Sequence, residues 1–161
     1  MKRWIFRIAG GLLLAGSILL ANQWLTAEPV EPPDVWQSMA VGEVQIQRPD
    51  GSSATLPVRI AQTASQRAQG MQHLPAAIIR EHPIWFAFNQ PQVVSWHMRN
   101  VALPLDILYI DASGRIIGRE VMQPNGTGYG INAPITAALE LAAGQAADYG
   151  LEVGVRLRLG R

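Results

Sequence analysis

The chain has 161 residues, enough for one domain of ordinary size and a leader, and 48% of them are hydrophobic against 16% charged. It contains no cysteine, which excludes disulfide bonds, zinc–thiolate sites and a cysteine nucleophile. The formal net charge is +1 and no basic run stands out in the body of the chain, so nucleic acid is not an expected partner.

A basic segment followed by an apolar run opens the chain. Lys2, Arg3 and Arg7 precede an almost unbroken apolar stretch over residues 8–21. This is the pattern of a signal peptide or membrane anchor. The next basic residue is Arg48, so the charge bias predicts a cytoplasmic N-terminus and export of the rest.

The leader, residues 1–27, has two alternative fates. Ala27 offers a cleavage point for a signal peptide. Residues 4–25 are instead about as long as a membrane-spanning helix, through which the protein would associate with the membrane. Both alternatives predict a protein that is periplasmic or anchored to the inner membrane facing the periplasm.

After the leader, residues 28–40 are acidic and rich in proline, which predicts an extended linker before a single mainly-β domain over residues 41–161. Alternating or dense apolar residues predict strands at 43–48, 54–61, 84–88, 93–98, 107–111, 115–121 and 155–159. Residues 137–142 could form a strand or a helix by propensity. Short helices are predicted from a capping box at Thr63 towards Gln72, and around 145–149. The glycine-rich segment 125–130 is not expected to form regular structure.

These elements favour a mainly-β fold. The expected architecture is an antiparallel β-sandwich or partly closed barrel with two short helices, preceded by an N-terminal apolar helix. The sequence has no internal repeat. It also lacks the alternation of long helices with strands that would indicate a parallel α/β fold.

The predicted strand over residues 93–98 carries the first candidate site residues. Side chains alternate across a strand, so the apolar Trp96 and Met98 would share the core face while His97 and Arg99 share the other. His97 and Arg99 are therefore either solvated polar positions or a recognition surface for an anionic or polyol ligand.

Two carboxylates follow. Asp106 opens an apolar strand, and either ties down loop amides with Arg99 neutralising it, or lines a pocket with Arg99 and Asn100. Glu140 lies between two leucines and could pair with an arginine, or converge with Asp106 as the second carboxylate of a glycan hydrolase.

Other chemistries have weaker signals. His73, His82 and His97 do not have the spacing of a zinc motif, and no Gly-x-Ser-x-Gly nucleophile elbow is present. No cofactor and no metal are therefore expected. Tyr129, in the glycine-rich loop, could stack against a sugar ring together with a tryptophan.

The segment Met98-Arg99-Asn100 followed by Pro104-Leu105-Asp106 is a specific motif, with Gly70-Met71 upstream and Leu139–Gly144 downstream. On these residues the chain resembles the family called domain of unknown function 192, over roughly Val58 to Leu159. The resemblance implies a mainly-β sandwich-like domain and no particular reaction. His97 stands where that family usually has tryptophan, and Val101 where it usually has threonine, which implies a site of altered specificity if the family's site depends on them.

Together the sequence favours an exported, non-enzymatic module that binds an unknown ligand or protein of the cell envelope. Its expected ligand-binding residues are His97, Arg99, Asn100, Asp106, Glu140 and Tyr129. The alternatives are a glycan hydrolase that uses Asp106 and Glu140, and a purely structural or protein-interaction module.

Overall fold

The structure is a computed structural model that describes residues 30–160. The predicted leader, residues 1–27, with its apolar helix, lies outside the described residues. Within residues 30–160, no helix has both the length and the hydrophobicity needed to cross a bilayer.

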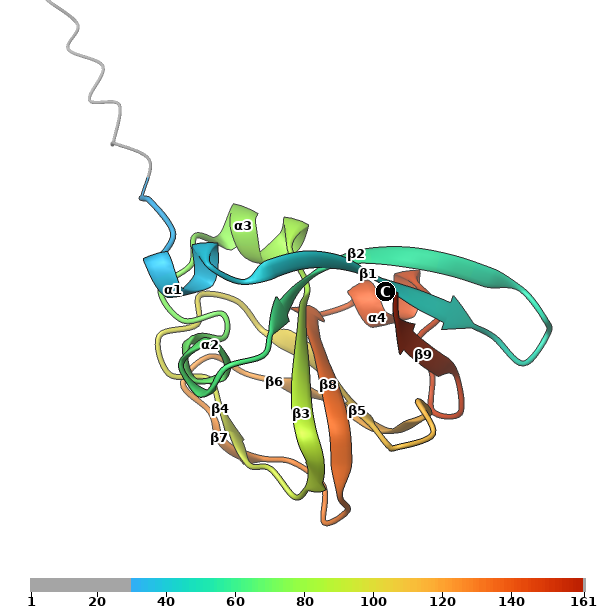
Figure 1. Ribbon diagram of the computed structural model, residues 1–161. Helices are drawn as coiled ribbons and strands as arrows, with labels where there is room; N and C mark the ends of the chain where they lie inside the picture. The colour runs from blue at the N-terminus through green and yellow to red at the C-terminus, as the bar shows by residue number, and fades with distance from the viewer. Residues whose placement is uncertain (1–29, 161) are drawn as a thin grey trace, which may run out of the picture.

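A mixed sheet of seven strands forms the centre of the described domain, in the order β6-β5-β8-β3-β2-β1-β9 (Figure 1). Its strands are β1 (Ala40–Gln47), β2 (Ser53–Ala61), β3 (Ile84–Gln92), β5 (Leu105–Ile110), β6 (Ile116–Met122), β8 (Ile135–Ala142) and β9 (Arg156–Leu159). The mainly-β prediction is confirmed, and each strand expected in the sequence outside 93–98 corresponds to one of these.

The antiparallel prediction is correct for every strand pair of this sheet except β2 and β3, which run parallel. The connection between them, from Gln62 to Pro83, contains two helices. A crossover of this length can return the chain to the starting end of the sheet, which a tight hairpin cannot do. The sheet does not close into a barrel within the described residues, although an isolated bridge joins Arg115 to Arg156 beside its two edges.

Four short helices, rather than the predicted two, are present in the described part of the chain: α1 (Asp34–Gln37), α2 (Ala64–Gln69), α3 (Ala76–Glu81) and α4 (Gln145–Asp148). The capping box of α2 forms as predicted, with Thr63 Oγ1 accepting from Gln66 N and Gln66 Oε1 accepting from Thr63 N. Sequence analysis missed α3, whose start is signalled by Pro75 at its N-cap.

The first helix lies in the segment that was expected to be an extended linker. Trp36 of α1 is 3% exposed and Met39 is 2% exposed. The Arg59 guanidinium lies 4.1 Å from the Trp36 ring centre. Residues 34–39 are thus packed on the domain by apolar and cation–π contacts.

The two faces of the sheet are covered by different elements. One face packs against α1, α2, α3 and the loops around residues 98–101 through side chains such as Met71, Ile79, Phe86 and Met98. On the opposite face, Leu139 and Leu141 pack in one core with α4 and with side chains of β1 and β9 from the far edge of the same sheet. We call these the helical face and the α4 face.

The prediction that residues 125–130 form no regular structure is wrong, because part of this segment belongs to a small two-stranded sheet. Residues Thr127–Tyr129 form β7, which pairs with β4 (Trp96–His97). The glycines provide positive backbone φ angles, +78° at Gly128 within β7 and +143° at Gly130 directly after it. Pairing with a distant strand, which local sequence does not encode, makes the middle of this loop regular.

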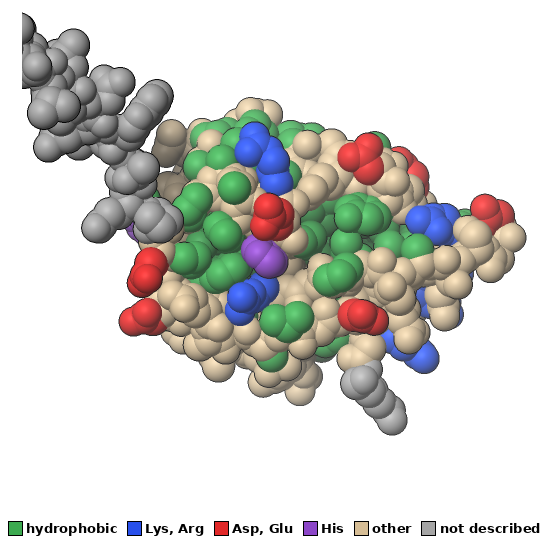
Figure 2. Space-filling view, turned by 90° about the horizontal axis from the view of Figure 1, so that it is seen from above, with side chains coloured by type: hydrophobic (Ala, Val, Ile, Leu, Met, Phe, Trp, Pro, Cys, Tyr) green, Lys and Arg blue, Asp and Glu red, His purple; other side chains and the backbone are tan. Residues whose placement is uncertain are grey.

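Charged side chains of both signs are interspersed with hydrophobic ones on the surface above α1, α3 and the β1–β2 hairpin, and no single sign dominates this face (Figure 2).

Candidate functional site

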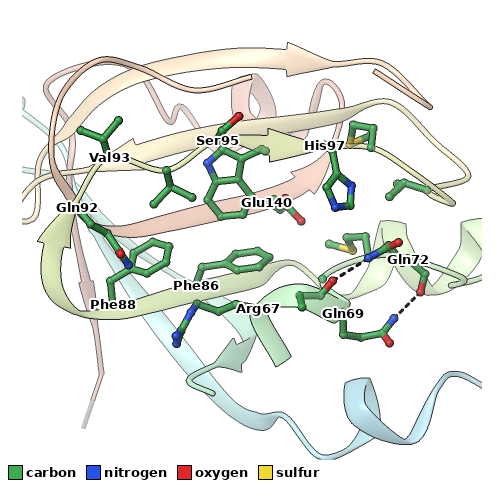
Figure 3. A pocket seen from close by; sticks show the side chains of 17 residues that line it. Arg67, Gln69, Gln72, Phe86, Phe88, Gln92, Val93, Ser95, His97 and Glu140 are labelled. Carbon is green, nitrogen blue, oxygen red and sulfur yellow. Dashed lines mark hydrogen bonds between the residues drawn. The ribbon is translucent and has the colours of Figure 1, made fainter. Parts of the chain in front are cut away.

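A cavity of about 410 Å³ opens on the helical face, between α2 and the segment that leads from β3 into β4. Its apolar walls include Phe86, Phe88 and Trp96, and its polar lining includes Gln69 and His97 (Figure 3). Its volume falls in the usual range for sites of small molecules, and its lining combines aromatic side chains with many polar ones.

The aromatic wall is rigidly built. The rings of Phe86 and Trp96 meet edge to face with centroids 4.8 Å apart, and Phe88 lies 6.4 Å from Trp96 in a similar arrangement. Such contacts hold aromatic side chains in place beyond the effect of burial alone. Trp96 Nε1 is buried and has no hydrogen-bond partner within the described residues.

Glu140 supplies the carboxyl group of this cavity. It belongs to β8, in the middle of the sheet, where Ile84 of β3 and Ile107 of β5 are its cross-strand neighbours. These isoleucines belong to the core of the helical face, so Glu140 points to the same side. Its side chain extends into the cavity between Phe86 and His97 (Figure 3).

The environment of Glu140 favours its neutral form. Only 5% of the residue is exposed. Burial raises the pKa of Glu140 to about 8, from an ordinary value of 4.5, and neither a hydrogen bond nor an opposite charge counteracts this. The ion pair within residues 30–160 joins Arg119 to Glu152 at 3.2 Å, so Arg119 is not a partner of Glu140.

A second acid lies near this region but is internally satisfied. Glu120 of β6 accepts a hydrogen bond from the Tyr109 hydroxyl and another from Gly130 N, at 2.9 Å. Burial, the bond to Glu120 and the nearby Glu140 all raise the pKa of Tyr109, which therefore stays protonated.

Asp106 lies on the other face of the sheet. Its Oδ2 accepts hydrogen bonds from Gly144 N at 2.8 Å and Ala146 N at 2.9 Å, at the start of α4. This supports the reading in which Asp106 ties down loop amides, but Arg99 is not its partner. Asp106 is a cross-strand neighbour of Leu141, whereas Glu140 is a neighbour of Ile107.

Asp106 and Glu140 therefore do not converge. Adjacent positions in a strand point to opposite faces, and the sheet separates the two carboxyl groups. A glycan hydrolase needs both carboxyl groups on one substrate bond, so the hydrolase expectation built on this pair does not fit the structure.

The remaining expected site residues are divided between the cavity and its surroundings. His97 is exposed, lines the cavity, and its Nδ1 accepts from Arg99 N at 3.3 Å. Arg99 is exposed outside the cavity. Asn100 has a φ of 58°, and its Nδ2 lies 3.1 Å from His73 Nε2, which joins two loops.

Tyr129 is a packing residue rather than an open stacking platform. It is half-buried against the core of the helical face, and its hydroxyl accepts a hydrogen bond from Gln123 N at 2.9 Å. It lies opposite Trp96 in the β4–β7 pair and is not among the residues that line the cavity.

Sequence reasoning brought His97 and Glu140 into the candidate set and missed most of the cavity. The residues it missed are Arg67, Gln69, Gln72, Phe86, Phe88 and Gln92. The available signals were Gly70, which ends α2 at a φ of +46°, and the aromatic cluster of β3. The positive φ of Gly70 favours glycine, whereas a Cβ there would make only ordinary contacts, 3.5 Å from Phe86 and 3.8 Å from Glu140 Oε2.

For a metal ion, the described residues 30–160 contain no group of three or more histidine, aspartate or glutamate side chains placed to hold one. The cavity can instead hold an organic molecule against aromatic walls and present it with one acid.

Fold and cavity together define a mixed-sheet β domain with a small-molecule-sized site on one face. The chain belongs to the DUF192 family, described as "Uncharacterized ACR", whose model matches residues 45–159. No curated protein matches the chain.

Two crystal structures are similar to this domain. One, from Sinorhizobium meliloti 1021, is described as a "putative transcription regulator"; it is 31% identical, with a TM-score of 0.69, and the match covers 76% of this chain and 95% of that one. The other is a protein of unknown function from Novosphingobium aromaticivorans DSM 12444, 23% identical, with a TM-score of 0.64, covering 83% of this chain and 94% of that one. The second likeness concerns the fold alone.

Proposed function

We propose that this protein is a ligand-binding module whose site is the cavity between α2 and β4. The observation that carries the proposal is Glu140, a residue 5% exposed whose carboxyl group has no partner among residues 30–160 and points into an open cavity. Buried polar groups are almost always paired, and an unpaired one at a cavity is a common mark of a functional site.

The placement of the other polar groups supports binding rather than catalysis. His97 reaches the same cavity, but the second carboxylate expected from the sequence lies across the sheet. A two-carboxylate hydrolase would need a second acid on the same substrate bond, and the described lining of the cavity contains Glu140 as its single carboxylate.

A blocking variant tests the site. Val93 is 59% exposed and lines the cavity, so Val93→Trp should cover it without disturbing the core. Val121 on β6 is 49% exposed and lies outside the lining, so Val121→Trp is the matched control. We expect a thermal-shift panel on the full chain, with amines, sugars, carboxylates, phosphates and muropeptides, to find a ligand. At about a hundred times its dissociation constant such a ligand stabilises by roughly 2.7 kcal/mol.

The expected result is a shift in melting temperature of several degrees that Val93→Trp abolishes and Val121→Trp retains. A panel without any shift, or a shift that survives in Val93→Trp, would contradict the proposal. If no ligand shifts the melting temperature and Val93→Trp changes nothing, the domain would instead be a structural or protein-interaction module.

We also propose that the module works outside the cytoplasm, because residues 1–27 have the basic and apolar segments of an export leader. In a bacterial host, a C-terminal tag on the full chain should be digested by protease added to spheroplasts and protected in intact cells. Protection in spheroplasts would show that the domain stays inside.

A further inference from the structure

The acid at the base of the cavity is without a countercharge. Glu140 is flanked on both neighbouring strands by isoleucines and is 5% exposed. Ionising a carboxyl group in such surroundings is costly unless a cation or several hydrogen bonds compensate. The chain itself supplies neither within the described residues.

Each element around Glu140 has its titratable groups engaged elsewhere or at a distance. From β5, Tyr109 donates its hydroxyl proton to Glu120. From α2, Arg67 donates to the carbonyls of Gln62 at 2.6 Å and Ala87 at 3.2 Å. Its side chain extends away from Glu140, beneath Phe88 (Figure 3).

The strands and the cavity rim add one further titratable group. From β4, His97 points into the cavity but is not paired with Glu140 among the described residues. The neighbours from β3 are the apolar Ile84 and Phe86. Among residues 30–160 no group therefore neutralises an ionised Glu140, and a bound ligand could supply the countercharge.

The cavity walls suit a positive charge. The faces of aromatic rings attract cations, and Phe86, Phe88 and Trp96 all line the cavity. Phe88 already has a cation beside it, since the Arg67 guanidinium lies 5.5 Å from the ring centre.

The amides at the rim offer acceptors. Gln69 Nε2 donates to Gln72 O at 2.6 Å, and Gln72 Nε2 donates to Ala68 O at 2.7 Å, as the dashed lines in Figure 3 show. Because both NH₂ groups are bound to the backbone, the side-chain oxygens are left to accept hydrogen bonds from a ligand.

We propose that the ligand of this cavity is a small organic ammonium ion, whose charged head binds the carboxylate of Glu140 and whose carbon chain packs on the aromatic wall. This inference rests on the proposed function, because it names the ligand class of the same site. Neutral polyols and carboxylates are the competing classes. A polyol could bond a protonated Glu140, and a carboxylate would leave the acid uncompensated or need Arg67.

Proton linkage separates these classes. Because burial raises the pKa of Glu140 to about 8, an ammonium ion must expel the Glu140 proton when it binds near neutral pH. Its affinity should fall about tenfold for each pH unit below about 8. A polyol that binds the protonated acid should show no such fall.

Three probes that differ in the head group test the inference: n-butylammonium, 1-butanol and butyrate. Dissociation constants would be measured from NMR chemical shifts of the full chain, in non-ionic detergent, between about pH 6 and about pH 9. We expect butylammonium to bind at least about tenfold more tightly than butanol at the upper pH, since only the ion gains from the carboxylate. Glu140→Gln should remove both this advantage and its pH dependence.

The controls separate Glu140 from other groups. Arg99→Ala, outside the cavity, should leave the profile unchanged. His97→Gln should retain the rise in affinity between about pH 7 and about pH 8, roughly fivefold, if Glu140 causes it; loss of this rise in the variant would overturn the assignment to Glu140.

The inference and the proposed function fail differently. If butanol or butyrate binds in the cavity as tightly as butylammonium, the ammonium inference is overturned and the binding function stands. If butylammonium leaves the resonances of cavity residues unchanged, the inference is overturned, and the Val93→Trp comparison on the wider panel decides the proposed function.

Discussion

Replacing Glu140 by glutamine is expected to make the protein increasingly more stable than the native chain as the pH rises from about 5 to about 9. The folded state holds the Glu140 proton up to a pKa of about 8, whereas an unfolded chain releases it near 4.5. Between these values the folded state binds more protons, so the free energy of unfolding falls as the pH rises. This loss is complete above about pH 8 and corresponds to at most roughly 5 kcal/mol.

The measurement is urea denaturation of both chains at several pH values across that range. The difference between the two free energies of unfolding isolates Glu140, because the other titrating groups are common to both. A difference that stays constant with pH would mean that Glu140 ionises in the folded state as it does in water.

Replacing Asp106 by alanine is expected to lower the free energy of unfolding by about 3 kcal/mol. The substitution removes the acceptor of two backbone N–H groups, Gly144 at 2.8 Å and Ala146 at 2.9 Å, of which the second bond is fully buried. Asp106→Asn retains one carbonyl oxygen as acceptor and should lose about half as much.

The melting temperature of Asp106→Ala should fall by roughly 10 °C. Ligand binding in the cavity should be unchanged at temperatures where the variant is folded, because Asp106 lies on the α4 face and the cavity on the helical face. A folded Asp106→Ala protein that had lost binding would place Asp106 in the site after all.

The two acids are thus opposite cases of burial. Asp106 is buried and paired with backbone amides, and it stabilises the start of α4. Glu140 is buried without a partner in the described part of the chain, at a position where its neighbours in the strand, Leu139 and Leu141, are apolar. An apolar residue at Glu140 would avoid the cost of burying an acid. A residue that lowers stability in the middle of a sheet is expected where that residue serves a function.

Much of the fold could be predicted from local sequence. Alternation of apolar and polar residues located β1, since the spacing of side chains along a strand is a property of the backbone. Turn residues between apolar segments located β2, β5 and β6. The capping box at Thr63 located α2, because its hydrogen bonds join residues three positions apart. The family motif around Met98–Asp106 likewise marked the family to which the chain belongs.

Long-range pairing decided the rest. The parallel pairing of β2 with β3 depends on how the crossover between them folds, and β7 exists only because β4 lies beside it. The α3 helix has six residues, too few for its own periodicity to identify it.

For the site, the acids and the histidine could be identified from the sequence, as could the placement of Asp106 and Glu140 in apolar segments. Folding brings out three further features: the two acids face opposite sides of the sheet, backbone amides satisfy Asp106, and an aromatic cavity surrounds Glu140. The physical reason is register. A shift of one residue between β5 and β8 would exchange the faces of their side chains, and register depends on pairing between strands far apart in the chain.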